Sequence, residues 1–160
     1  MEIILNQLER NLPYNDSLAI HFTLAHSRWI AQVKDDAYQN LTDYGLNFIK
    51  NDTIKIEMTN LYGNRKEFLY KLDERFNLFY YQVAAPVLID CFDKITPHAL
   101  SREKMIPLNY RELSKNLKYK SILKSTKAYM EGYISWQENT ILNGLNELVN
   151  RLDTEIKYND

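Results

Sequence analysis

Cysteine is almost absent from this chain of 160 residues, which carries Cys91 alone. A single cysteine excludes an intramolecular disulfide and every Cys-x-x-Cys zinc or redox pair. Its neighbours Leu88, Ile89 and Phe92 are apolar. We therefore predict that Cys91 is a buried and unreactive thiol rather than a nucleophile.

Glycine and proline are also scarce, with four of each. Few glycines together with long periodic segments favour an all-α protein. A chain of this length corresponds to one domain and can bury enough surface to fold without a metal ion or a disulfide. We predict a single helical domain over residues 1–160, built as a bundle and without a cofactor.

The chain has neither an excess of one charge nor a long hydrophobic run. Its 20 basic and 21 acidic side chains give a formal net charge of -1, which argues against nucleic-acid binding and against a polybasic membrane contact. The longest apolar run, Val83–Ile89, is too short to span a bilayer. No signal peptide follows Met1, so we expect the chain to be soluble as given.

One long amphipathic helix is predicted over about residues 52–95, with Asp52 as its N-cap. Apolar residues return every three or four positions along it, which places them on one face of a helix. They are Ile54, Met58, Leu61, Tyr62, Phe68, Leu69, Leu72, Phe76, Phe79, Tyr80, Val83 and Val87. Gly63 weakens this helix, and Pro86 predicts a kink near Gln82–Pro86 or two helices meeting there.

A second long helix is predicted over about residues 119–157. Its apolar stripe runs through Ile122, Leu123, Thr126, Tyr129, Met130, Tyr133, Trp136, Ile141, Leu145, Leu148, Val149, Leu152 and Ile156. The nearly heptad spacing from Ile141 onward indicates packing along another long helix, so we expect an antiparallel pair. Gly132 and Gly144 mark a close approach to another helix or are merely tolerated.

Shorter helices are predicted on either side of the first long one. The expected ranges are 2–11, 15–33 with Asn15 or Asp16 as its cap, 37–44 ended by Gly45, and 110–117 capped by Asn109. The alternating residues 18–24 also fit a strand, but we prefer a helix because no second strand is available for pairing. Residues 97–108, which include two prolines, are predicted to form the one substantial loop.

Candidate catalytic and metal-binding groups are few. His21, His26 and His98 form no helical zinc or di-iron signature, so we predict no metal site. Asp90 and Asp93 could form an acid–base pair if they were buried, but near a helix end they are better interpreted as solvated. Because the sequence offers no other group of catalytic side chains, we predict that the protein is not an enzyme.

The aromatic side chains are the most suggestive feature. Tyr80, Tyr129, Tyr133 and Trp136 are candidate ligand-binding residues that could line an aromatic pocket between the two long helices. The simpler interpretation is a plain core stripe, and any exposed part of the stripe could instead contact a protein partner.

Residues 37–52 read AYQNLTDYGLNFIKND and are followed by Ile54 and by Leu61 and Tyr62. In this pattern a helix ends in glycine, a short apolar link follows, and Asn-Asp opens a long helix. It resembles an uncharacterised family of membrane-anchored Bacteroidetes proteins with a domain of unknown function (DUF6090). The resemblance covers about 25 residues well, and the rest of the helical layout loosely.

The resemblance implies a basic stretch and a single transmembrane helix ahead of the soluble portion, neither of which this sequence contains. It also implies a location on the extracytoplasmic face of the cytoplasmic membrane in the full-length protein. We therefore expect a non-enzymatic interaction or sensory module, with a protein partner or a homodimer. The alternative is a small-ligand-binding domain that uses the aromatic pocket.

Overall fold

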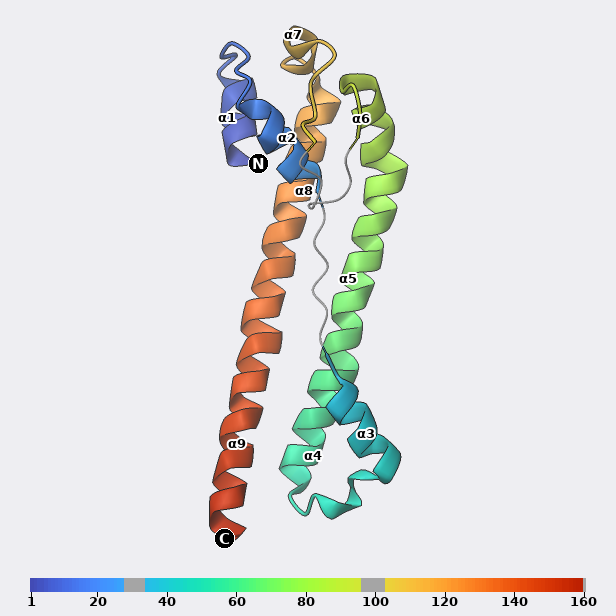
Figure 1. Cartoon of the computed structure of the whole chain (residues 1–160), viewed down its shortest axis with the longest axis vertical. Coiled ribbons are helices and arrows are strands. Elements are labelled where there is room, and N and C mark those ends of the chain that lie inside the picture. The colour runs from blue at the N-terminus through green and yellow to red at the C-terminus, as the bar shows by residue number, and fades with distance from the viewer. Residues whose placement is uncertain (28–33, 96–102, 160) are drawn as a thin grey trace. The chain divides into compact units, whose positions relative to one another are not determined.

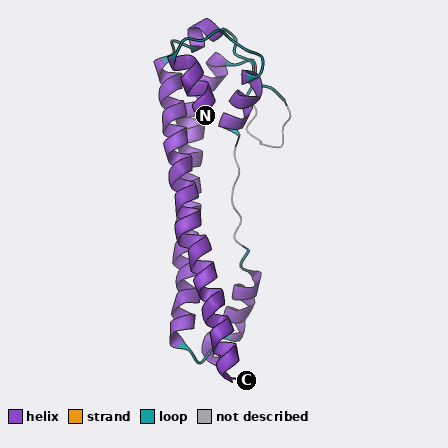
Figure 2. Ribbon diagram, turned by 90° about the vertical axis from the view of Figure 1, so that its left-hand side faces the viewer, coloured by secondary structure: helices purple, strands orange, loops and turns teal. Residues whose placement is uncertain are grey.

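The structure is a computed structural model that describes residues 1–27, 34–95 and 103–159 (Figure 1). Helices account for 79% of the described residues, and the described part contains no strand (Figure 2). Phe92 and Pro107 form an isolated antiparallel bridge. The predicted all-α class is therefore confirmed.

The chain separates into two compact units, and each is built from two segments. Unit 1 consists of Met1–Ile30 and Arg75–Met130, and unit 2 of Ala31–Glu74 and Glu131–Asp160. Each unit has its own cluster of buried apolar side chains. The single domain predicted over residues 1–160 therefore stays a prediction.

Helices account for most of both units. The helical elements of unit 1 are α1 (Glu2–Glu9), α2 (Leu18–His26), the π-helical turn η3 (Tyr80–Ala84), α6 (Ala85–Cys91) and α7 (Tyr110–Leu113). The elements α5 (Lys66–Phe79) and α8 (Leu117–Trp136) contribute residues to both units. Those of unit 2 are α3 (Asp36–Tyr44), the 3-10 turn η1 (Leu46–Phe48), α4 (Asp52–Thr59), the π-helical turns η2 (Asn60–Arg65) and η4 (Gln137–Leu142), and α9 (Asn143–Asn159).

The two long helical stretches, 52–91 and 117–159, pair in opposite directions within unit 1. The rings of Phe76 and Tyr129 lie 4.7 Å apart. Further along, the Asn116 side-chain amide donates to the sulfur of Cys91 at 3.6 Å. Residue numbers rise on one stretch as they fall on the other, so the predicted antiparallel arrangement holds in this unit.

Unit 2 shows the same arrangement. The Asn51 side chain donates to the Glu155 carboxylate at 2.9 Å, and the Arg65 guanidinium donates to the Thr140 carbonyl at 3.3 Å. The helix α4 therefore runs antiparallel to α9 in this unit as well.

One series of buried residues along the stretch 52–91 alternates intervals of seven and eight, and Met58, Tyr80 and Leu88 are buried beside it. The series consists of Ile54, Leu61, Leu69, Phe76, Ala84 and Cys91. Seven residues of an α-helix make almost two turns, whereas an eighth residue would rotate the next side chain away from the buried face. Both intervals of eight coincide with a π-helical turn, η2 or η3, which absorbs the extra residue.

The stretch 117–159 follows the same rule. Its buried residues Tyr119, Thr126 and Tyr133 are seven apart, as are Ile141 and Leu148. Tyr133 and Ile141 are eight apart, and η4 lies between them. The π-helical turns therefore keep one face of each stretch buried.

Near Gln82–Pro86, where a kink or a meeting of two helices was predicted, the π-helical turn η3 ends at Ala84 and α6 begins directly after it at Ala85. Pro86 lies in the first turn of α6, where its missing N–H removes little helical hydrogen bonding. The helix ends at Cys91, earlier than predicted, because Phe92 adopts an extended conformation and bridges Pro107.

The cap of α4 also differs from the prediction. The Asn51 side-chain oxygen, rather than that of Asp52, accepts hydrogen bonds from the N–H groups of Thr53 at 3.0 Å and Ile54 at 3.4 Å. Asp52 is the first helical residue, and it pairs with Lys55 at 2.8 Å. Asn and Asp are equally good caps, so the sequence alone could not choose between adjacent candidates.

Residues 18–24 are helical, as preferred over a strand. The cap of α2 is Ser17, and Asn15 instead accepts a hydrogen bond from the Ser17 N–H at 2.9 Å. The helix ends at His26 because Ser27 is extended, so the prediction of one helix that continues towards Val33 is wrong at this point, and residues 28–33 lie outside the described residues. The helix α3 ends at Tyr44, and Gly45 follows it with a φ of +83°, a positive value that glycine adopts without strain.

The Asn109 cap is confirmed, since its side chain accepts from the Glu112 N–H at 3.2 Å. The helix that follows is shorter than predicted and ends at Leu113. Asn116 accepts from the Tyr119 N–H at 3.0 Å and so opens α8. Of the predicted loop 97–108, residues 97–102 lie outside the described residues.

The core of unit 1 centres on the fully buried ring of Tyr119. Phe22, Phe92 and His26 surround it, with ring centroids between 5.5 and 6.4 Å away. The Nε2 atom of His26 lies 3.2 Å from the Tyr119 hydroxyl. Burial lowers the pKa of His26 to about 3, because the charged imidazole would lose its hydration.

The core of unit 2 joins α4 to η4 and α9. Arg65 and Leu61 lie against Gly144, where an added Cβ would meet the Arg65 Nη1 atom at 2.6 Å and the Leu61 Cδ1 atom at 3.2 Å. A Cβ at Gly132 would meet nothing within 4 Å. Gly144 therefore marks a close approach, and Gly132 is tolerated.

We expect unit 1 to lose stability as the pH falls below about 6.5. The folded state holds His26 neutral while the unfolded chain takes up a proton, so this group removes about 1.4 kcal/mol per pH unit until the pH approaches about 3. Chemical denaturation at pH 7, 6 and 5 measures the slope. His26→Phe should flatten it and His21→Gln should leave it unchanged; an equal slope in all three proteins would contradict this assignment.

The two glycines should respond oppositely to alanine. Gly132→Ala should raise the free energy of unfolding by about 0.5–1 kcal/mol, because alanine favours helix and no neighbour is displaced. Gly144→Ala should raise it less or lower it, because the methyl group displaces Arg65 from the Thr140 carbonyl. Urea denaturation of both variants tests the difference, and equal gains would refute the close approach.

Candidate functional site

The four predicted ligand-binding aromatics are divided between the two units. Tyr80 and Tyr129 belong to unit 1, whereas Tyr133 and Trp136 belong to unit 2. Tyr80 and Tyr133 are buried, and the other two are half-buried.

The ring contacts of Tyr80, Tyr129 and Trp136 are with other aromatic side chains. Tyr80 meets Tyr81 edge-on at 5.4 Å, and the ring of Trp136 lies 4.4 Å from Phe68. None of the four lines the two surface pockets described below. The predicted aromatic pocket therefore stays a prediction.

Asp90 and Asp93 are both exposed, as the solvated interpretation predicted. The Asp93 carboxylate accepts hydrogen bonds from the N–H groups of Lys94 and Ile106, each at 2.9 Å. The Asp93 side chain therefore links the residues directly after α6 to the segment around Ile106 that precedes α7. Asp90 instead lines a pocket.

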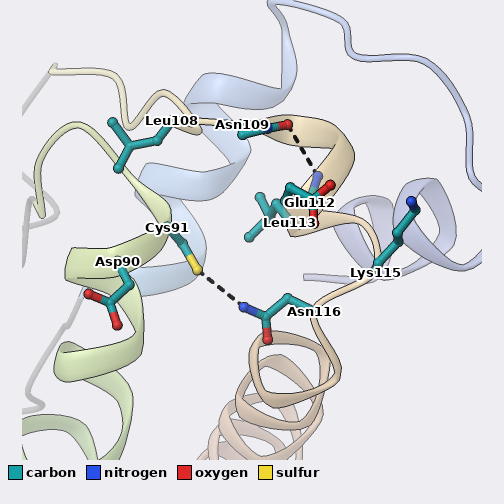
Figure 3. A pocket seen from close by; sticks show the side chains of 8 residues that line it. All are labelled: Asp90, Cys91, Leu108, Asn109, Glu112, Leu113, Lys115 and Asn116. Carbon is teal, nitrogen blue, oxygen red and sulfur yellow. Dashed lines mark hydrogen bonds between the residues drawn. The ribbon is translucent and has the colours of Figure 1, made fainter.

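That pocket, in unit 1, has a volume of about 290 Å³ and lies where α6, α7 and the start of α8 meet (Figure 3). Its lining residues are Asp90, Cys91, Leu108, Asn109, Glu112, Leu113, Lys115 and Asn116. The Leu108 N–H donates to the Cys91 carbonyl at 2.9 Å, which fixes the loop beside the helix end.

The thiol in this pocket is not activated. Burial raises the pKa of Cys91, the Asp90 carboxylate raises it further, and the hydrogen bond from Asn116 opposes both effects. A protonated thiol is a poor nucleophile and a poor metal ligand. The predicted burial of Cys91 is confirmed, and the pocket offers polar contacts rather than a nucleophile.

Metal binding finds no support among the described residues, which contain no group of three or more His, Cys, Asp or Glu side chains that could hold an ion. His98 lies outside them. In the same ranges, no helix combines the length and the apolar character needed to cross a bilayer.

A further candidate surface is an apolar stripe on one side of α8, η4 and α9 in unit 2. We call it the exposed stripe and define it as Ile134, Leu142, Val149 and Ile156, whose exposed fractions lie between 50% and 59%. Leu145 and Leu152 are half-buried and pack against the core of unit 2.

The sequence prediction placed Val149 and Ile156 on the packed face, and the structure corrects both. They belong to the exposed stripe, because α4 covers the neighbouring face that contains Ile141 and Leu148. Leucine, valine and isoleucine at these positions look alike in sequence. Only their burial distinguishes the two faces of the helix.

Two carboxylates interrupt the exposed stripe. Glu138 lies four residues after Ile134 and Asp153 lies four residues after Val149, so both fall on the same side of the helix. Both side chains are exposed. The surface is therefore apolar with acidic positions.

The thiol of Cys91 should alkylate more slowly in the folded protein than in the unfolded chain at pH 8, since burial raises its pKa. Asp90→Asn removes a charge that also raises this pKa, so it should shift the pH dependence of alkylation to lower pH. Asp153→Asn, in the other unit, is the charge-matched control. A profile that Asp90→Asn leaves unchanged would disprove the electrostatic influence of Asp90.

Comparisons of this chain with protein-family models, with curated proteins and with solved structures found no match.

Proposed function

We propose that this protein is a non-enzymatic interaction module and that the exposed stripe of unit 2 binds an amphipathic helix of a partner protein. The observation that supports this is the row of half-exposed Leu, Val and Ile side chains on α8, η4 and α9. Apolar side chains that gather on one side of a folded protein are typical of interaction sites, whereas singly scattered ones are not.

The spacing of the row favours a helical partner. Leu142, Leu145, Val149, Leu152 and Ile156 alternate intervals of three and four, which is the seam along which two helices pack at a shallow angle. The half-buried Leu145 and Leu152 form one edge of this seam, and the exposed stripe forms the other. From Ile134 to Ile156 the row is roughly 30 Å long at the rise of an α-helix.

The charge on the row favours a basic partner over a second copy of the chain. Glu138 and Asp153 lie within it, so flanking Lys or Arg side chains on the partner would complement them. A second copy would bring the same two carboxylates to the contact. Like charges at an interface are unfavourable.

The proposal also includes the location of the protein. The resemblance to a membrane-anchored family supports a module that is tethered to the cytoplasmic membrane and faces outward in the full-length protein. The partner would then be a membrane or extracytoplasmic protein that presents a basic amphipathic helix.

A synthetic amphipathic helix of about three heptads tests the surface, with Leu at its seam positions and Lys on its flanks. Fluorescence anisotropy should show binding, and a Glu-flanked version should bind at least about tenfold more weakly. Leu142→Gln and Val149→Gln should each weaken binding by about tenfold or more. Ile56→Gln, an exposed residue on α4, is the matched control.

Three outcomes would overturn the proposal. The first is no binding of either peptide, and the second is equal weakening by Ile56→Gln. The third is a dimer in sedimentation experiments that Leu142→Gln dissociates, which would make a second copy the occupant of the stripe.

A further inference from the structure

A surface groove of unit 1 combines two cations with apolar walls and shares Lys115 with the pocket beside Cys91. Its volume is about 460 Å³, within the range of sites for small organic ligands. The lining residues are Asn11, Leu12, Pro13, Tyr110, Arg111, Ser114 and Lys115. Two are cationic and none is acidic, although the chain as a whole carries a net charge of -1.

Both cations project from one helical turn. Arg111 lies in α7, and the turn continues beyond it because the Ser114 N–H donates to the Tyr110 carbonyl at 2.9 Å. Side chains four residues apart lie on one side of such a turn. The buried residues Leu113 and Ser114 fix the turn to the protein and leave Arg111 and Lys115 exposed.

The opposite wall is held in place by Gln7 of α1. Its carbonyl accepts from the Leu12 N–H at 3.1 Å, and its side-chain amide donates to the Pro13 carbonyl at 2.8 Å. Tyr110 is fixed by its ring contact with Tyr14, with centroids 5.2 Å apart. A site whose walls are already ordered loses little conformational freedom when a ligand binds.

We propose that this groove binds a small organic anion, with a carboxylate or phosphate head on an apolar body. The head pairs with Arg111 and Lys115, since guanidinium and ammonium groups are the usual partners of such oxygens. The apolar body lies against Leu12, Pro13 and the ring of Tyr110. This site belongs to unit 1 and is independent of the exposed stripe of unit 2, so either proposal can fail alone.

Benzoate and phenyl phosphate are suitable probes, with benzamide as the neutral isostere of benzoate. In NMR titrations of the whole chain, benzoate should shift the amide signals of residues 10–14 and 110–116, and benzamide should not. Arg111→Gln and Lys115→Gln should each raise the dissociation constant about tenfold. Lys118→Gln, an exposed lysine outside the groove, should leave it unchanged.

The preferred head group follows from which of the two anions binds more tightly, and binding of either supports the site. Equal binding of benzamide would overturn the proposal, as would equal weakening by Lys118→Gln. Absence of shifts with both anions would overturn it as well.

Discussion

The structure depends on one geometric constraint, which is that each long helical stretch must return its buried side chains to the same face. Neither seven nor eight residues correspond to a whole number of turns of an α-helix. Intervals of seven are close enough to two turns to be tolerated, and each interval of eight is accompanied by a π-helical turn. Without η2, η3 and η4, residues such as Leu69, Ala84 and Ile141 would rotate away from their cores.

Much of this fold could be predicted from residues with distinctive backbone chemistry. Gly45 and Asn109 were identified as helix boundaries, and Pro86 as the site of an irregularity, because their backbone preferences hold in almost any context. The turn η4 contains neither glycine nor proline. Its only sequence signal is the interval of eight between Tyr133 and Ile141, which becomes readable once both are known to be buried.

The candidate sites were harder to predict because they depend on which face of a helix is covered. Cys91 has apolar neighbours in sequence, so its burial could be inferred locally. Val149 and Ile156 have the same chemistry as Leu148, and only the position of α4 determines which of these side chains are exposed and which are buried. The groove at Arg111 and Lys115 also needed tertiary information, since Leu12 and Pro13 lie about a hundred residues earlier in the chain.

The π-helical turns are also the positions where deleting one residue from the chain should reduce the stability of the fold least. Removing one residue from η4 would leave an ordinary α-helix in which the flanking buried positions are seven apart, so the buried face of this stretch would be kept. Removing one residue from the middle of α9 would instead rotate every later side chain by about 100°. Natural variants of different length should therefore carry their single-residue deletions within η2, η3 or η4.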